Sequence, residues 1–152
     1  YTYDDLGRLV TVTEPGMGTV VSYAYTLDDQ VEILTTHSAD NALSLVESFT
    51  YHPDGAAGAG QYATRTSAGL TTHYAYSLRD QVLRTWGDTY PLRYEYDDFG
   101  RMAKLHTYPD AAAFNVATPS WPDGNATTWS YHPATGQLLA GHLLRHGRFA
   151  IN

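Results

Sequence analysis

The sequence contains no cysteine, and this absence excludes two kinds of protein. A small domain held together by disulfide bonds and a zinc site built from thiolates both require cysteine. Charged residues are also scarce, at 16% of the 152 residues, against roughly 25% in typical soluble domains. No apolar run approaches the ~20 residues of a membrane-spanning helix, so the sequence predicts no membrane span.

Basic residues are the scarcer charged group, with nine Lys and Arg against sixteen Asp and Glu and a formal net charge of −7. Because phosphate backbones and anionic membranes attract clustered positive charge, we expect neither nucleic acid nor a membrane surface as a partner. The chain has no initiating methionine and no apolar leader, and it opens inside a repeated motif. We therefore expect it to be a segment of a longer protein.

Tyrosine is abundant in this chain, which holds 13 Tyr and 13% aromatic residues. Tyrosine and threonine suit the half-buried, pleated surface of a β-sheet and are only middling helix formers. The composition therefore favours an all-β fold, at a length typical of one domain.

An internal repeat organises the aromatic residues. Each copy is an aromatic residue, any residue and then a tyrosine, so that both aromatic side chains project from the same face of a strand. The second tyrosines are spaced by 22, 26, 25, 20 and 35 residues. The six pairs are Tyr1 and Tyr3, Tyr23 and Tyr25, Phe49 and Tyr51, Tyr74 and Tyr76, Tyr94 and Tyr96, and Trp129 and Tyr131.

A turn signal follows every pair. Four or five residues after the second tyrosine stands a residue that tolerates a left-handed backbone, and it predicts a short hairpin loop closed with a bulge. These residues are Gly7, Asp29, Gly55, Asp80, Gly100 and Gly136. A long polar residue and an apolar residue then restart the strand. With a second, less regular turn in each copy, the pattern predicts about a dozen strands in an antiparallel meander.

The repeat divides the chain into one run of about six units. We predict their bounds as 1–20, 21–46, 47–71, 72–91, 92–126 and 127–152. Residues 53–60 are rich in Gly and Ala and predict a loose loop, and residues 108–125 predict a surface insertion. For residues 137–152 the leucines allow a short helix, but the register of the repeat favours a strand.

The segments Tyr1–Leu9 and Tyr94–Met102 read Tyr-x-Tyr-Asp-x-x-Gly-Arg followed by an apolar residue. This form resembles the signature of the RHS/YD-repeat family, and the resemblance extends over nearly the whole chain. It implies a fold of tandem antiparallel β-hairpins that form a curved, twisted sheet, a segment of a β-shell. Members include Rhs polymorphic toxins, shell components of Tc toxins, wall-associated proteins and teneurins.

The resemblance implies a structural role within a larger exported or cell-surface protein, which we expect to be bacterial. In toxin members the shell encloses a C-terminal effector, so further repeats and an effector of the same long chain are the implied partners. Such shells end in a core segment with a self-cleaving aspartate. No such segment precedes Asn152, so we assign neither autoproteolysis nor toxin activity to these residues.

The candidate site residues are structural: the six aromatic pairs, the turn glycines, and Asp4, Arg8, Asp97 and Arg101. The regular placement of the aromatic pairs in every copy favours packing between repeats. An alternative is that the aromatic ladder binds carbohydrate as an extracellular adhesion module, with cell-surface glycans or a protein receptor as partner. An enzyme ranks last, because no set of catalytic residues stands outside the repeat.

Two acidic or histidine patterns suggest metal binding but are better explained by structure. The pairs Asp4–Asp5, Asp28–Asp29 and Asp97–Asp98 recur at turns, where Asp side chains bond nearby amides. His142 and His146 are spaced to share one face of a helix, but no helix is secure there. We therefore predict no catalytic residue, no metal ligand and no cofactor.

Overall fold

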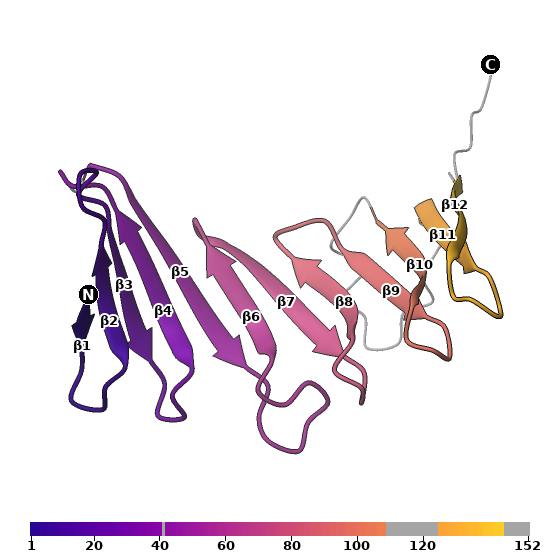
Figure 1. Ribbon diagram of the computed structural model, residues 1–152, viewed down its shortest axis with the longest axis horizontal. Helices are drawn as coiled ribbons and strands as arrows, with labels where there is room; N and C mark the ends of the chain where they lie inside the picture. Colours follow the sequence, from indigo (N-terminus) through magenta and orange to yellow (C-terminus); the bar gives the residue numbers. More distant parts are fainter. Residues whose placement is uncertain (41, 109–124, 145–152) are drawn as a thin grey trace. The chain divides into compact units, whose positions relative to one another are not determined.

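The computed structural model describes residues 1–40, 42–108 and 125–144. In these residues the regular secondary structure consists of β-strands (Figure 1). The strands are β1 (Thr2–Tyr3), β2 (Leu9–Thr13), β3 (Val20–Tyr25), β4 (Val31–His37), β5 (Ser44–Tyr51), β6 (Tyr62–Ser67), β7 (Leu70–Tyr76), β8 (Val82–Gly87), β9 (Leu92–Tyr96), β10 (Met102–Thr107), β11 (Asn125–Tyr131) and β12 (Leu138–Leu144).

The strands lie in the sheet in the order in which they occur in the chain, and the registered pairs are antiparallel. The predicted all-β fold of tandem antiparallel hairpins is therefore confirmed. Residues 138–144 form strand β12, as the register predicted, and not a helix. Most of the predicted insertion at 108–125, namely 109–124, and residues 145–152 lie outside the described residues.

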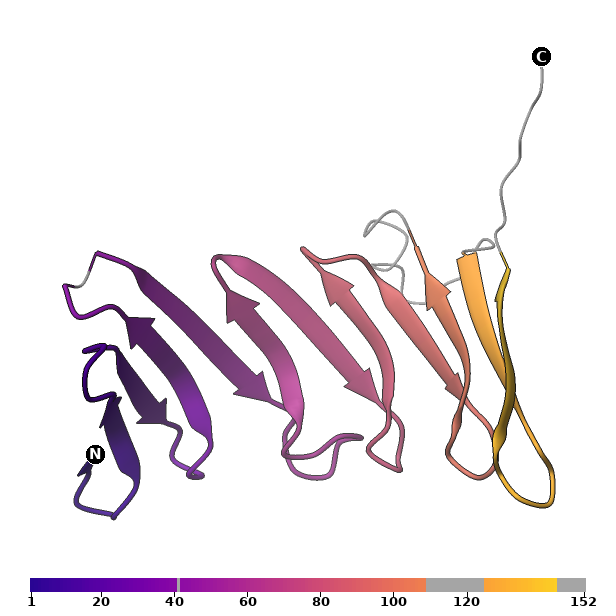
Figure 2. The same ribbon diagram turned by 45° about the horizontal axis from the view of Figure 1, so that its top comes forward.

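The chain forms two compact units, Tyr1–Thr71 and Thr72–Asn152, with the boundary inside β7. Figure 2 shows the strands of each unit running alternately up and down. Few described side chains are nearly fully buried: Phe49 in the first unit, and Thr85, Pro91, Tyr108 and Ala126 in the second. A single layer of hairpins has no central core, so contacts between neighbouring hairpins must stabilise it.

The two faces of the sheet differ in chemistry. One face carries the aromatic pairs, whose members stand two residues apart on their strands. On the other face of the first unit, threonine hydroxyls pair across strands, with Oγ1–Oγ1 distances of 2.6 Å for Thr2–Thr11 and 2.7 Å for Thr50–Thr64. Such cross-strand pairs fix the register without a deep core.

Every hairpin has a bulge beside its second tyrosine. Tyr25 lies opposite Val31 while Ala24 lies opposite Ile33, so one extra residue, Glu32, bulges from the second strand. The same shift occurs in the other five hairpins, where the extra residues are Val10, Ala63, Leu83, Ala103 and Leu139. A bulge increases the local twist and disrupts the ladder. The sequence analysis predicted a bulge that closes the loop, but not that the extra residue lies on the second strand.

Strands of successive repeats pair only at the end away from these turns. Between β8 and β9 the register covers Arg84 with Arg93 and Thr85 with Leu92. Between β10 and β11 it begins at Lys104. Toward the turns the strands diverge, which leaves backbone carbonyls there without a ladder partner. This opening is where the recurring side chains of the repeat converge.

Candidate functional site

A carboxylate closes the first turn. Asp4 Oδ1 accepts hydrogen bonds from the backbone N–H groups of Leu6 at 3.0 Å and Arg8 at 2.8 Å. Its Oδ2 accepts from Arg8 Nε at 2.8 Å. Asp97 repeats this arrangement with Arg101, at 2.9 Å to the backbone N–H and 2.7 Å to Nε. The aspartate thus shapes the turn and orients the arginine that follows it.

These contacts stabilise the ionised form of both aspartates. Hydrogen bonds from the backbone and side chain of Arg8 lower the pKa of Asp4. Desolvation raises the pKa of Asp97, but hydrogen bonds from Arg101 outweigh it, so that pKa is also lowered. Both carboxylates are engaged in the turn, which explains the recurrence of aspartate without a catalytic role.

Other copies replace the aspartate with a neutral acceptor. Thr26 Oγ1 accepts from the backbone N–H of Gln30 at 3.2 Å, and Ser77 Oγ from that of Gln81 at 3.3 Å. His132 Nδ1 accepts from the N–H of Thr135 at 3.1 Å. Aspartate is thus followed by arginine, and Thr or Ser by glutamine. The sequence analysis missed these acceptors, although each directly follows the second tyrosine.

The turn residues adopt the expected left-handed backbone. The φ angles are 79° at Gly7, 80° at Gly100 and 70° at Gly136. Asp29 and Asp80 hold the same position at 60° and 58°, at a steric cost that glycine avoids.

The third turn includes the whole loop predicted at residues 53–60, and Gly55 is not the residue that closes it. Gly55 has a φ of 82°, but it does not close the hairpin. The N–H of Gly60 donates to His52 O at 3.0 Å, and the N–H of His52 donates to Gln61 O at 2.9 Å. Gly60 and Gln61 therefore take the places that Gly7 and Arg8 hold in the first turn, and the Gly- and Ala-rich residues 53–60 form one extended loop.

The second tyrosine of a repeat joins it to the repeat before. Its hydroxyl donates to the backbone carbonyl of the apolar residue that follows the preceding turn. The pairs are Tyr25 to Leu9 at 2.6 Å, Tyr51 to Val31 at 2.6 Å, Tyr96 to Val82 at 2.9 Å and Tyr131 to Met102 at 2.8 Å. These carbonyls lie where the strands diverge, so the phenol supplies the donor that the next strand does not.

This contact explains a regularity in the sequence. The second position is tyrosine in all six pairs, whereas the first is Tyr, Phe or Trp. Among the described residues, the first-position hydroxyls of Tyr23 and Tyr94 have no hydrogen-bond partner. Only the second position needs a hydroxyl, while the first needs an aromatic ring.

Polar side chains form a second link between turns. The Arg8 guanidinium lies 4.7 Å from the Tyr25 ring centroid, and its Nη1 is 2.7 Å from Asp29 Oδ1. Arg101 lies 4.3 Å from the Tyr131 ring in the same way. In the two copies where Thr or Ser replaces the aspartate, a glutamine makes the link. Gln30 Nε2 donates to Gly60 O at 3.1 Å, and Gln81 Nε2 donates to Gly100 O at 2.9 Å. These four restarting residues therefore each contact the next repeat.

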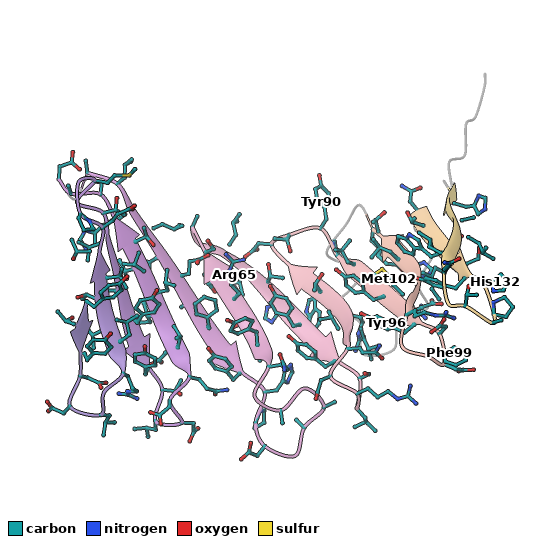
Figure 3. The ribbon with its side chains drawn as sticks, in the orientation of Figure 1. Arg65, Tyr90, Tyr96, Phe99, Met102 and His132 are labelled. Carbon is teal, nitrogen blue, oxygen red and sulfur yellow. The ribbon has the colours of Figure 1, made fainter. Side chains whose placement is uncertain are left out.

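The first aromatics pack against their neighbours to different degrees. Phe49 stacks on Tyr62 with ring centroids 5.0 Å apart, and Tyr62 also contacts Tyr51 at 5.3 Å. Arg65, labelled in Figure 3, pairs with Glu47 on the adjacent strand. The remaining pair members are Tyr23, Tyr74, Tyr76 and Tyr94, all half-buried, Trp129, which contacts Gly141, and Tyr1 and Tyr3, which are exposed at the edge strand β1.

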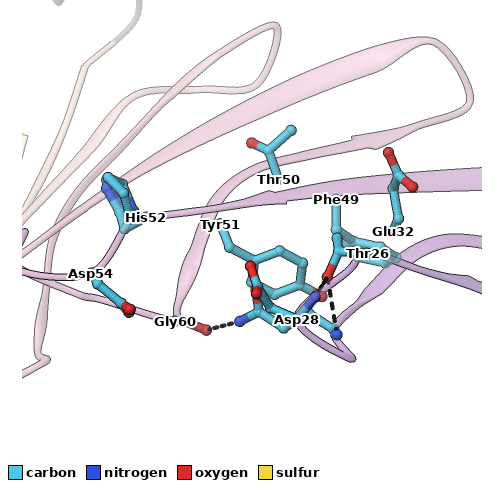
Figure 4. Close-up of a pocket in the computed structure, with 11 residues that line it drawn as sticks. Thr26, Asp28, Glu32, Phe49, Thr50, Tyr51, His52, Asp54 and Gly60 are labelled. Atoms are coloured by element: carbon cyan, nitrogen blue, oxygen red, sulfur yellow. Dashed lines mark hydrogen bonds between the residues drawn. The ribbon is translucent and has the colours of Figure 1, made fainter.

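A cavity of about 650 Å³ opens at the diverging ends of β4 and β5 (Figure 4). The long third turn forms one wall of it. Its lining includes the carboxylates of Asp28, Glu32 and Asp54, the ring of Tyr51 and the imidazole of His52. Within the described ranges, no group of three or more His, Asp or Glu side chains is arranged to hold a metal ion.

The histidines near the turns and strand ends lie in different settings. His52 and His132 directly follow the second tyrosine at turns. His142 lies on β12 opposite Thr128, and His146 lies outside the described residues. The described segments also contain no helix long and apolar enough to cross a membrane.

Comparison with known proteins supports the assignment that the repeat suggested. A family model described as RHS Repeat matches residues 3–43. No curated protein sequence matches the chain. A chain in the structure of the Photorhabdus luminescens Tc holotoxin pore is similar, with a TM-score of 0.67 and 25% sequence identity over 92% of this chain. The match spans only 6% of that toxin chain.

The family model covers the first two hairpins, and the structural similarity extends across nearly the whole chain. The hydrogen-bonded turn and the tyrosine contact repeat over the same span. The motif, the hairpin architecture and both comparisons agree that this chain is an RHS/YD-repeat protein.

Proposed function

We propose that this chain is a length of wall in a larger β-shell, and that the shell encloses or presents a C-terminal effector of the same long protein. The observation that carries the proposal is the tyrosine contact between repeats. It fastens four of the hairpins to the one before, and the tyrosine that makes it is present in every copy, so the number of hairpins is open-ended. A modular sheet with no central core is suited to building an extended wall.

The similarity to the toxin chain supports the proposal that this chain is part of a larger protein. The chain corresponds to a small fraction of the toxin chain that it resembles. We propose that this chain belongs to a protein that bacteria export. We also propose that the chain acts as a scaffold and not as an enzyme, since its recurring carboxylates and arginines are engaged with one another in the turns.

The proposed repeat division follows the same contacts. We propose six units with the bounds 1–20, 21–46, 47–71, 72–91, 92–126 and 127–152. Four of the unit boundaries are bridged by a described tyrosine hydrogen bond from the second tyrosine of one unit to the unit before. Within the repeats, we propose that the turn is shaped by Asp4 with Arg8 and by Asp97 with Arg101.

Limited proteolysis of the longest natural protein that contains residues 1–152 tests enclosure. The C-terminal segment should resist protease while the wall is intact and should be cleaved rapidly when expressed alone. The C-terminal segment should resist the protease for a shorter time in a full protein that combines Tyr25→Phe, Tyr51→Phe, Tyr96→Phe and Tyr131→Phe. Equal cleavage of the free and the attached segment would contradict enclosure.

Glycan binding by the aromatic ladder stays an alternative prediction. Four of the second tyrosines donate to the repeat before, so the first aromatics are the better candidates for contact with a glycan. A glycan array tests it: binding that is lost on Trp129→Ala or Tyr94→Ala, with the fold retained, would support this role, and no binding to any glycan would refute it.

A further inference from the structure

Two of the tyrosines that join repeats have a guanidinium over the ring. The Arg8 Cζ atom lies 4.7 Å from the Tyr25 ring centroid, and that of Arg101 lies 4.3 Å from the Tyr131 ring centroid. In both cases the arginine belongs to the repeat before, and the tyrosine hydroxyl donates to the carbonyl of the residue that follows the arginine. The repeat thus brings a cation to the face of an aromatic ring, which attracts it.

Tyr51 makes the same contact with the repeat before, but the arginine is replaced. Its hydroxyl donates to Val31 O at 2.6 Å. The residue before Val31 is Gln30, whose Nε2 donates to Gly60 O at 3.1 Å. The position of the arginine is therefore held by a side chain that is shorter and carries no charge.

A cavity lies beside this glutamine. Gln30 and Tyr51 both line the space of about 650 Å³ at the diverging ends of β4 and β5 (Figure 4). Its lining comes from the repeat of Tyr51 and from the repeat before, so it lies on the side from which Arg8 and Arg101 reach their tyrosines. Ligand sites typically have volumes of about 300–1,000 Å³, so this cavity has room for a side chain or a small molecule.

The charge of the lining suits a cation. The carboxylates of Asp28, Glu32 and Asp54 line the cavity, and none of its lining residues is a lysine or an arginine. Among the described residues, these three carboxylates have neither an ion-pair partner nor a hydrogen-bond partner. Asp29 in the same turn differs, because its carboxylate lies 2.7 Å from the Arg8 guanidinium. Negative charge in the cavity is therefore not neutralised by the part of the chain that the structure describes.

The second glutamine copy has a cation of its own. Gln81 precedes the carbonyl that Tyr96 binds, as Gln30 does for Tyr51, but Arg79 stands in its turn where the second turn has Asp28. Four turns precede a described tyrosine contact, and of these only residues 26–30 contain no arginine. The boundary at Tyr51 is thus the one where the ring, the carboxylates and the space occur without the arginine.

We propose that this cavity binds the guanidinium group of a separate molecule, against the ring of Tyr51 and among the carboxylates of Asp28, Glu32 and Asp54. A guanidinium fits better than an ammonium because it is planar, stacks on aromatic faces and is more weakly hydrated. A metal ion fits less well, since within the described ranges no group of three or more His, Asp or Glu is arranged to hold one.

The carrier of the guanidinium should have no carboxylate of its own, because the lining would repel it. An arginine residue inside a peptide meets this condition, whereas the free amino acid does not. We therefore assign the site to an arginine side chain of a peptide segment. The assignment does not depend on whether the wall encloses an effector.

An NMR titration of the 152-residue chain with N-acetyl-arginine amide tests the proposal. The amide signals of Gln30, Tyr51 and Gly60 should shift, and those of Gln81 and Gly100, at the boundary whose turn contains an arginine, should not. N-acetyl-citrulline amide has almost the same shape without the charge. It should bind about tenfold more weakly, because the loss of one charged hydrogen bond changes affinity by roughly that factor. N-acetyl-lysine amide and free arginine should also bind more weakly than the blocked arginine.

Variants of the lining give a second test. Gln30→Arg supplies the guanidinium from within the chain, as Arg8 does in the first repeat, and should abolish binding while circular dichroism shows the fold retained. Glu32→Gln combined with Asp54→Asn should weaken binding by about tenfold or more. The matched control is Asp5→Asn, a turn aspartate outside the cavity, which should leave binding unchanged.

Four results would overturn the proposal. They are equal binding of the citrulline probe, equal shifts at Gln81 and Gly100, undiminished binding by a folded Gln30→Arg chain, and an equal loss of binding in Asp5→Asn. Tighter binding of free arginine than of the blocked arginine would contradict the assignment to a peptide.

Discussion

Removing the hydroxyl of Tyr96 tests how repeats are held together. In the Tyr96→Phe variant the ring remains, but the carbonyl of Val82 loses the donor that now lies 2.9 Å away. That carbonyl is beyond the registered part of the β8–β9 pair, so no backbone N–H of β9 replaces the phenol. The substitution therefore isolates one hydrogen bond between two repeats.

The expected cost follows from the burial of the group. A net hydrogen bond in a protein contributes about 0.5–1.5 kcal/mol, and a fully buried unpaired carbonyl costs about 1–3 kcal/mol. Tyr96 is only half-buried, and desolvation raises its pKa, so its surroundings lie between water and a dry interior. We expect a loss of about 1 kcal/mol, and about 2 kcal/mol when Tyr131→Phe in the same unit is added.

Urea unfolding followed by tryptophan fluorescence measures this loss. Trp86 and Trp129 lie in the second unit, with Tyr96 and Tyr131. For an m-value of about 1–2 kcal/mol/M, a loss of 1 kcal/mol lowers the midpoint by about 0.5–1 M. The matched control is Tyr94→Phe, whose hydroxyl has no partner among the described residues, and it should stay within about 0.5 kcal/mol of the parent chain.

The comparison between the two variants decides the matter. If Tyr96→Phe and Tyr94→Phe unfold at the same urea concentration, the phenol contributes nothing to the link between repeats. The recurrence of tyrosine at the second position would then need another cause.

Three further predictions follow from the turns. Gly7→Ala should destabilise the chain by about 1–2 kcal/mol in urea unfolding. The cause is the backbone φ of 79°, because no atom lies within 4 Å of the new Cβ. Asp80→Gly, at an equivalent position, should be neutral or stabilising. Asp97→Ser should destabilise, and adding Arg101→Gln should restore part of the loss, because serine is followed by glutamine elsewhere in the repeat; a double variant no better than Asp97→Ser would contradict the pairing. Because the pKa of Asp97 is lowered in the folded chain, its contribution to the free energy of unfolding is present above the ordinary aspartate pKa of about 3.9 and is lost as the pH falls below it. The difference in the free energy of unfolding between the parent chain and Asp97→Asn should therefore narrow below about pH 4. A constant difference from about pH 7 to about pH 3 would be inconsistent with that pKa.

Local patterns made much of the fold predictable. An aromatic residue at positions i and i+2 indicates a strand with one aromatic face, and a glycine four residues later indicates a tight turn with positive φ. Both features depend on the backbone of a few neighbouring residues, so Gly7 and Gly100 were identified without any tertiary information. The six copies also gave the number of strands, because each copy needs two.

Contacts between repeats were not predictable in the same way. Whether Tyr25 bonds to Leu9 depends on how far β2 and β3 diverge at the end of β2 that holds the bulge at Val10. A bulge leaves no fixed residue type in the sequence. The recurrence of tyrosine at the second position, with Phe49 and Trp129 allowed at the first, was the one available sign that a hydroxyl was needed.

In the third turn, the spacing of the repeat does not identify the glycine that closes the hairpin. Gly55 stands at the expected distance from Tyr51 and has the expected φ of 82°, yet the hairpin closes at Gly60. Several glycines in residues 53–60 satisfy the backbone requirement equally, and only the hydrogen bonds of His52 select among them.

Electron cryomicroscopy of the longest natural protein that contains residues 1–152 tests the central claim most directly. The account predicts that these residues form part of a continuous hairpin wall, with each tyrosine hydroxyl on the carbonyl described above and with another part of the chain inside the wall. A map in which residues 1–152 form an isolated sheet, with solvent on both faces and no enclosed segment, would contradict it.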